Sequence, residues 1–174
     1  MRTAITVSPA AWLASPPNPT SPARVLVNFR PPVAVCEFKG PARFLRAAGL
    51  SRSRGGLANP WGEWWTPEEV LSRIVTRLDQ YEGWLRADEL RKAVPAQYRG
   101  LAAICRDWND LSEIWELSLP PGEVLQGLVG QAREQPEYSH LDPKRRTTPM
   151  LAGGAEQVFF KVKNPFWVRR VSGF

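Results

Sequence analysis

The sequence is poor in the residues from which disulfide frameworks and metal sites are built. Its 174 residues include two cysteines and one histidine. Cys36 and Cys105 lie far apart and outside any CxxC pattern, so they predict neither a disulfide framework nor a zinc site. His140 has no second histidine to act with, which excludes chemistry that needs a histidine pair. We therefore expect no bound metal.

Long hydrophobic runs and several common catalytic motifs are also missing. No apolar run approaches the roughly 20 residues of a membrane span, and the first residues lack the uninterrupted hydrophobic stretch of a signal peptide. We expect no membrane partner, and a protein that is cytoplasmic or is delivered into a target cell without a cleavable signal. The sequence has no P-loop, GxGxxG, nucleophile elbow or HExxH. Kinase, dehydrogenase, hydrolase and metalloprotease functions therefore have no support.

The net charge of +6 is unevenly distributed along the chain. Residues 1–54 carry eight Lys and Arg against one acid, residues 55–130 carry seven against twelve, and residues 131–174 carry eight against four. Basic ends that adjoin in space would form a cationic face for phosphates, either of a nucleotide or of a nucleic acid. The alternative interpretation is an ordinary solvated surface.

Proline content and hydrophobic patterns divide the chain into a short arm and one domain. Residues 1–23 are rich in Ser-Pro steps that disfavour helix, so we expect an N-terminal strap or loose arm. Residues 24–174 suffice for a single α+β domain. Thr66-Pro67-Glu68-Glu69 has the pattern of a capping box with Thr66 as N-cap, and a helical insert is expected over residues 67–108. Strands are expected at residues 24–29, 33–38, 111–119, 124–129, 156–162 and 166–171.

A pair of glycines precedes a polar pair in the segment GGAEQ at residues 153–157. The glycines permit positive φ angles, so the chain can turn sharply before it enters a strand at Glu156. Alternation places Glu156 on the face that carries Val158 and Phe160, and leaves Gln157 at the strand's edge, facing a cleft or solvent. The alternative is a glycine hairpin in which Gln157 only caps a backbone group. The spacing by itself favours that alternative, because a GGxxQ match is weak.

Arginines beside glycines form a second candidate site. An arginine held near a glycine can offer its planar fork to a phosphate or carboxylate, because the backbone approaches closely there. Arg46, three residues before Gly49, is the preferred candidate. Arg43 is equally compatible with a surface position on a short helix.

Tryptophans form a third candidate site around Gly62. Trp61, Trp64 and Trp65 could stack on a nicotinamide or a nucleobase, an interaction of about 1–3 kcal/mol per base. The alternative is that one or two of them pack in the core beside the start of the helix.

The order of these motifs resembles the small ADP-ribosyltransferase-like and NAD glycohydrolase domains of bacterial polymorphic toxins, over roughly residues 36–171. In that pattern an arginine precedes a glycine, and a strand with glycine and aromatic residues follows. A helical insert, a strand ending in Pro-Pro-Gly and a Gly-Gly-x-x-Gln strand complete it. The resemblance implies a small split antiparallel β-sheet with a helical insert. The matching pieces here are Arg46 with Gly49, then residues 62–66, 67–108, 115–122 and 153–157.

The resemblance also implies NAD as the substrate. Enzymes of this kind cleave the nicotinamide N-glycosidic bond through an oxocarbenium-like state, so orientation and electrostatics matter more than a strong nucleophile. Glu156 is an alternative to Gln157 as the catalytic residue, because a carboxylate would stabilise the cation better. The implied roles are Arg46 beside Gly49 for the NAD diphosphate, Ser51 or Ser53 for the family's middle serine, Trp64 or Trp65 for the nicotinamide ring, and Gln157 for the nicotinamide ribose.

Several functions remain open within and beside this family. The site could transfer ADP-ribose to a protein or RNA acceptor, hydrolyse NAD, or bind it without turnover, and a toxin of this kind would have an immunity protein as a partner. The competing hypothesis is a non-enzymatic nucleic-acid- or protein-binding module that uses exposed tryptophans and the basic ends, including Lys144, Arg145 and Arg146. The absence of an RNA-binding aromatic motif and of a helix-turn-helix pattern counts against it.

Overall fold

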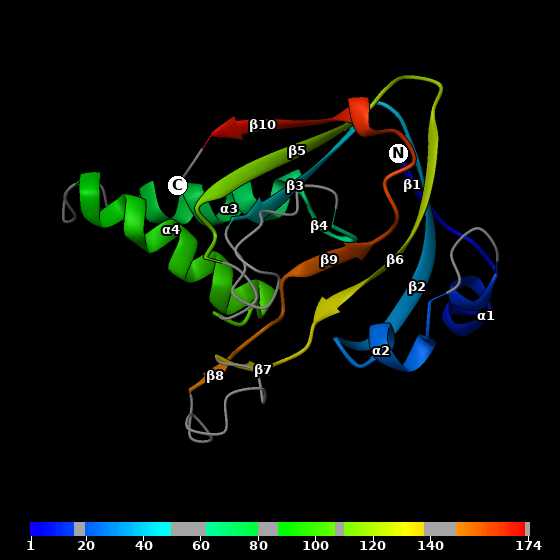
Figure 1. Cartoon of the computed structure of the whole chain (residues 1–174), viewed down its shortest axis with the longest axis horizontal. Helices are drawn as coiled ribbons and strands as arrows, with labels where there is room; N and C mark the ends of the chain where they lie inside the picture. The colour runs from blue at the N-terminus through cyan, green and yellow to red at the C-terminus, as the bar shows by residue number, and fades with distance from the viewer. Residues whose placement is uncertain (16–19, 50–61, 80–86, 107–109, 138–148, 173–174) are drawn as a thin grey trace.

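An antiparallel sheet forms the centre of the molecule, with helices packed against it (Figure 1). The computed structural model describes residues 1–15, 20–49, 62–79, 87–106, 110–137 and 149–172. The expected α+β class with an antiparallel sheet is confirmed. The sheet strands, in spatial order, are β1 (Arg2–Ala4), β2 (Phe29–Lys39), β6 (Val124–Ala132), β9 (Glu156–Phe159), β4 (Trp64–Pro67), β3 (Ala42–Ala48), β5 (Glu113–Leu119) and β10 (Val168–Ser172).

The short strand β4 joins two halves of this sheet. Its first two residues, Trp64 and Trp65, pair with β9, while Thr66 and Pro67 pair with β3. One half therefore contains β1, β2, β6 and β9, and the other contains β3, β5 and β10. A separate hairpin of β7 (Gln135–Pro136) and β8 (Met150–Leu151) extends from the first half.

An aromatic core fills the space between the two halves. Phe44 of β3 packs edge-on against Phe38 of β2 and against Phe160, with ring centroids 5.0 and 5.2 Å apart. Trp65 stacks on Phe160 at 5.8 Å. Because these rings come from both halves, the core fixes how the halves meet. The buried residues around them are Cys36, Leu117, Leu119, Leu125, Val129, Val158 and Val168.

The N-terminal region contains more regular structure than its prolines predict. Helix α1 (Pro9–Ala14) begins after Ser8, whose Oγ accepts a hydrogen bond from the Ala11 amide at 3.2 Å. Helix α2 (Pro22–Leu26) also begins on a proline. Proline suits the first turn of a helix, where its missing N–H is not needed, so the expected absence of helix is wrong. The strand expected at residues 24–29 is wrong for the same reason, and β2 begins only at Phe29.

Helices α3 (Glu68–Asp79) and α4 (Ala87–Ala102) lie within the region expected to be a helical insert. Their apolar sides pack on the β3–β5 half of the sheet, through Leu71, Ile74, Tyr98 and Ala102. The helix start at Glu68 agrees with the capping-box prediction, but Thr66 is not the cap. Its side chain lies in β4, where its hydroxyl shares a buried hydrogen bond with the Tyr98 hydroxyl at 2.5 Å.

Candidate functional site

A cleft of about 690 Å³ lies where β1, β3, α3 and the start of β9 approach one another. Its apolar wall includes Phe38 and Phe44 from the aromatic core. Its polar residues carry both signs of charge, a combination that suits a ligand with both an anionic and a cationic part. The charged residues that line it are Arg2, Arg43, Arg73, Glu68, Glu69 and Glu156.

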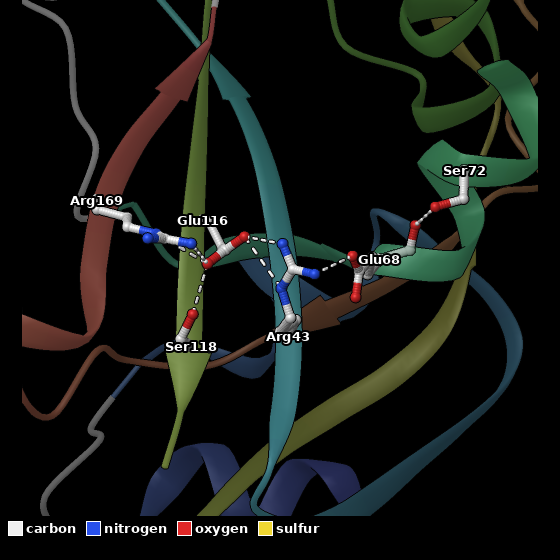
Figure 2. Close-up of polar contacts among 6 residues, drawn as sticks. All are labelled: Arg43, Glu68, Ser72, Glu116, Ser118 and Arg169. Carbon is white, nitrogen blue, oxygen red and sulfur yellow. Dashed lines mark hydrogen bonds and ion pairs between the residues drawn. The ribbon is translucent and has the colours of Figure 1, made fainter.

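A fully buried carboxylate holds the cleft residue Arg43 in place (Figure 2). Glu116, on β5, is 0% exposed, and its carboxylate lies between Arg43 of β3 and Arg169 of β10. Arg43 donates to Oε2 through Nη2 and, at 3.1 Å, through Nε. Arg169 Nη2 lies 2.9 Å from Oε1, and the Ser118 hydroxyl donates to the same oxygen at 2.6 Å.

These contacts account for a charge in a buried position. Burial by itself raises the pKa of the Glu116 carboxyl, but hydrogen bonds from Ser118, Arg43 and Arg169 outweigh it and lower the pKa below its ordinary value. A buried carboxylate without such partners would be strongly destabilising. The Glu116 cluster, which is Glu116 with Arg43, Arg169 and Ser118, therefore links three neighbouring strands.

Arg43 is also fixed from its other side by helix α3 (Figure 2). Its Nη1 lies 2.6 Å from Oε1 of Glu68, the first residue of that helix. The Ser72 hydroxyl donates to the Glu68 carbonyl oxygen at 3.1 Å within the first turn. The guanidinium is thus held between β5 and α3 while it lines the cleft.

Glu156 reaches the cleft from β9. Its Oε1 lies 2.5 Å from Nη1 of Arg2, and both side chains are partly exposed. This pair joins the N-terminal strand to the turn after the two glycines, so Arg2 orients the Glu156 carboxylate at the cleft wall.

Gln157 does not lie at the edge of a cleft, so its expected placement is wrong. It is 8% exposed, and its side-chain amide donates to the Ala102 carbonyl oxygen at 2.9 Å. The glycine turn before it serves the same helix end: the Gly153 and Ala155 amides donate to the carbonyls of Gly100 and Leu101, each at 2.9 Å. In this structure, the alternative in which Gln157 caps a backbone group describes the segment better.

Arg46 is not among the residues that line this cleft, and it lies close to the tryptophan motif. Its Nη1 donates to the Trp64 carbonyl oxygen at 2.6 Å. A Cβ at Gly62 would lie 2.1 Å from Nη2 of Arg46, so a larger residue there would displace the guanidinium from this position. Arg46 and residues 62–64 are therefore brought together by contacts between protein groups.

The two described tryptophans of the motif are packing residues in this structure. Trp65 is buried in the aromatic core, and its Nε1 donates to the Gly62 carbonyl oxygen at 2.7 Å. Trp64 packs against Phe29 and Phe159, with ring centroids 5.0 and 5.1 Å away. Trp61 lies outside the described residues.

Gly49, expected beside Arg46, directly follows β3 and is the last described residue before a gap. A Cβ at Gly49 would lie 1.8 Å from Oδ1 of Asp110, so the strand end packs tightly on the segment before β5. Ser51 and Ser53 are outside the described residues, and their role stays a prediction.

Sequence reasoning gave no site role to several of the residues gathered here, among them Arg2, Glu68, Glu116, Ser118 and Arg169. Arg2 was assigned to a loose arm, and Glu68 was treated only as part of a capping box. Glu116 had a visible signal, since it is an acid in the middle of an apolar strand, between Trp115 and Leu117. Such an acid needs partners for its charge, and two arginines on the neighbouring strands supply them.

The described residues contain neither a group of metal ligands nor a helix that could span a membrane. Across the described ranges, no three His, Cys, Asp or Glu side chains come together as metal ligands would. Over the same part of the chain, the helices are too short or too polar to span a bilayer.

Comparisons with known proteins add one likeness. No protein-family model and no curated protein matches the sequence. Among solved structures, the chain is similar to "Rhs1-CT in complex with cognate immunity protein RhsI1", with a TM-score of 0.43 and 12% sequence identity, over 98% of this chain and 97% of the other. A likeness at this level carries no conclusion about chemistry, which has to come from the residues of this chain.

Proposed function

We propose that this chain is an NAD-consuming, toxin-like domain that cleaves the nicotinamide N-glycosidic bond, as an ADP-ribosyltransferase or an NAD glycohydrolase. The observation that carries the proposal is a cleft with Arg43 from β3 and Glu156 from β9 in its walls. NAD has an anionic diphosphate and a cationic nicotinamide ring. An arginine fits the first, and a carboxylate fits both the second and the cation that develops during cleavage.

In the proposed reaction, the bond between ribose C1′ and the nicotinamide nitrogen breaks, and its electron pair leaves with nicotinamide. The Glu156 carboxylate would stabilise the ribosyl cation, while Arg2 keeps that carboxylate oriented. Water or an acceptor nucleophile then adds to C1′ and loses a proton. The protein's contribution is electrostatic and positional, which requires no strong nucleophile.

The proposal transfers two roles from the residues first implied by the resemblance. Arg43 takes the diphosphate role of Arg46, because Arg43 lines the cleft and Arg46 is bonded to Trp64. Glu156 takes the catalytic role of Gln157, because Glu156 lines the cleft and Gln157 is bonded to α4. Trp65 then supports the cleft indirectly, because it stacks on Phe160, which packs against the lining residue Phe44.

A toxin-like domain of this kind would also have an acceptor for ADP-ribose and an immunity protein as partners. ADP-ribose would be transferred to a protein or RNA acceptor, or to water, and an immunity protein would protect the producing cell. Expression of the chain alone should therefore arrest bacterial growth, and this arrest should require Glu156.

Nicotinamide release from NAD by the purified chain tests the proposal, measured with and without cell lysate and labelled NAD. We expect release, and a loss of about 10²-fold or more in Glu156→Gln, because electrostatic stabilisation of a transition state is worth that much. Glu134→Gln is the matched control, since Glu134 pairs with Arg30 at 2.6 Å but does not line the cleft. Neither nicotinamide release nor labelled acceptor from the wild-type chain would refute the proposal.

The alternative of a basic binding module is less well supported. At least six described arginines form ion pairs with glutamates, which lowers the net positive field that a nucleic-acid backbone would meet. Lys144, Arg145 and Arg146 lie outside the described residues. The paired arginines are Arg2, Arg30, Arg43, Arg106, Arg169 and Arg170.

A further inference from the structure

The Glu116 cluster connects an outer strand of the sheet to the cleft, which its structural role alone does not require. Arg43 and Arg169 approach the carboxylate from opposite sides, since β3 and β10 flank β5. Only Arg43 is also a cleft residue. The cluster therefore connects the outer strand of the sheet, through one buried carboxylate, to a cation in the cleft wall.

The contacts of Arg43 fix the orientation of its guanidinium and leave N–H groups that can bind an anion. Glu116 receives donation from Nε and Nη2, and Glu68 lies at Nη1. Among the described residues, these contacts engage three of the five N–H groups of the guanidinium, so two remain for a ligand. The side chain is 48% exposed, so those groups can be reached. A guanidinium already fixed in one orientation loses less side-chain freedom when it binds.

Arg169 offsets the charge that Glu116 brings to the cleft. Glu116 and Glu68 together carry two negative charges, which Arg43 alone cannot balance. With Arg169, the four side chains are neutral in sum, and without it they would carry one negative charge beside the ligand. Loss of Arg169 should thus weaken anion binding at a cleft that Arg169 itself does not line.

We propose that Glu116 is a positioning residue for a phosphate-binding subsite at Arg43, which takes the diphosphate of a nucleotide, and that Arg169 on the outer strand sets the strength of this subsite. The inference rests on the proposed function in placing phosphate at Arg43. It goes further in assigning control of the cleft to β10, a strand at the edge of the sheet.

Calorimetric binding of ADP-ribose to the purified full chain tests this inference. Glu116→Gln distinguishes two roles for Glu116, because a positioning role and a purely electrostatic role predict opposite changes in ADP-ribose affinity. The substitution adds positive charge near the cleft, so a purely electrostatic role predicts tighter binding. Positioning predicts binding weaker by at least about tenfold, because Arg43 loses a charge-assisted partner. Arg169→Ala should weaken binding in the same direction, and Ser118→Ala should do so less.

Neighbouring residues provide matched controls. Arg170 follows Arg169 on β10 and pairs with Glu113 on β5, at 3.4 Å, without contacting Glu116. Arg170→Ala and Glu113→Gln should leave ADP-ribose affinity within about twofold of wild type. Each variant's thermal unfolding is recorded, and binding is measured well below the lowest midpoint so that every sample is folded. Adenosine lacks the diphosphate, so Glu116→Gln and wild type should bind adenosine with the same affinity.

The outcomes separate this inference from the proposed function. ADP-ribose binding with the expected pattern but without NAD cleavage would uphold the subsite and refute the enzyme. NAD cleavage with equal KM in Glu116→Gln and Glu113→Gln would uphold the enzyme and overturn the subsite. Absence of ADP-ribose binding to wild type, or tighter binding to Glu116→Gln, would also overturn the subsite.

Discussion

The side-chain amide of Gln157 donates a hydrogen bond to the backbone carbonyl of Ala102, the last residue of α4, 55 positions earlier in the chain. The last carbonyls of a helix have no partner within the helix. Here Gly153, Ala155 and Gln157 supply donors to three consecutive carbonyls, at residues 100–102. The glycine turn is thus a helix cap built from a distant part of the sequence, and α4 is tied to the sheet through it.

Gln157→Ala should lower the free energy of unfolding by about 1–3 kcal/mol, because it leaves a buried carbonyl without its donor. Urea unfolding followed by circular dichroism measures the change. Gln126→Ala is the control, since its amide makes only a long contact of 3.5 Å with Glu37. If Gln157→Ala kept full stability while NAD cleavage was lost, Gln157 would act on the substrate instead.

Gly153→Ala should be more destabilising than Gly154→Ala. Both glycines have positive φ angles, +69° and +93°, so alanine is strained at either position. A Cβ at Gly153 would in addition lie 2.4 Å from the Ala132 carbonyl oxygen, whereas at Gly154 it would meet open space. Thermal unfolding midpoints of the two variants make the comparison. Equal midpoints would mean that the turn at Gly153 shifts freely, contrary to its role as a cap.

Thr66→Val and Tyr98→Phe should show coupling. Their hydroxyls are buried and 2.5 Å apart, so either single substitution removes a partner from the other hydroxyl. We expect each to cost about 1–2 kcal/mol and the double variant to cost less than their sum. A double-mutant cycle by chemical denaturation measures the coupling. Strict additivity would show that this pair does not help to hold α4 against β4.

Acid should destabilise the wild-type chain more steeply than Glu116→Gln. Burial raises the pKa of Glu116, but its hydrogen bonds bring the folded-state pKa below the ordinary value of 4.5. A carboxyl of this kind contributes stability above its unfolded pKa, and this stability is lost as pH falls through the folded pKa. The free energy of unfolding, measured in urea from about pH 7 to pH 3, should converge for the two proteins at the acid end. Parallel curves would mean that Glu116 has no lowered pKa.

The strands that could be predicted are those with continuous apolar patterns between turn signals. The strands expected at residues 111–119 and 124–129 are found at Glu113–Leu119 and Val124–Ala132, with Pro120, Pro121 and Gly122 between them. The helices Pro9–Ala14 and Pro22–Leu26 were not predicted, because proline breaks a helix internally but starts one well. Ser8-Pro9 and Ser21-Pro22 stand at helix starts, and only local hydrogen bonding distinguishes that position from a loop.

The candidate site was harder to predict because β9 is covered on both faces. Val158 and Phe160 pack in the aromatic core, while Phe159 packs beside Trp64 and Gln157 bonds to α4. Alternation identifies an inner face only when the other face meets solvent, so it could not orient Glu156 and Gln157. The choice between Arg43 and Arg46 likewise depended on the register of β3 with β5, where Arg43 lies opposite Ser118 and Arg46 opposite Trp115.

The ion pair between Arg2 and Glu156 has a practical consequence for recombinant work. Met1 and Arg2 line the cleft, and the Met1 amine donates to the Lys39 carbonyl oxygen at 3.2 Å. A purification tag joined directly to Met1 would therefore lie beside the cleft, where it could compete with nucleotides for access. Assays of ligand binding or NAD cleavage should therefore compare protein that carries a tag ahead of Met1 with the same protein after the tag is removed.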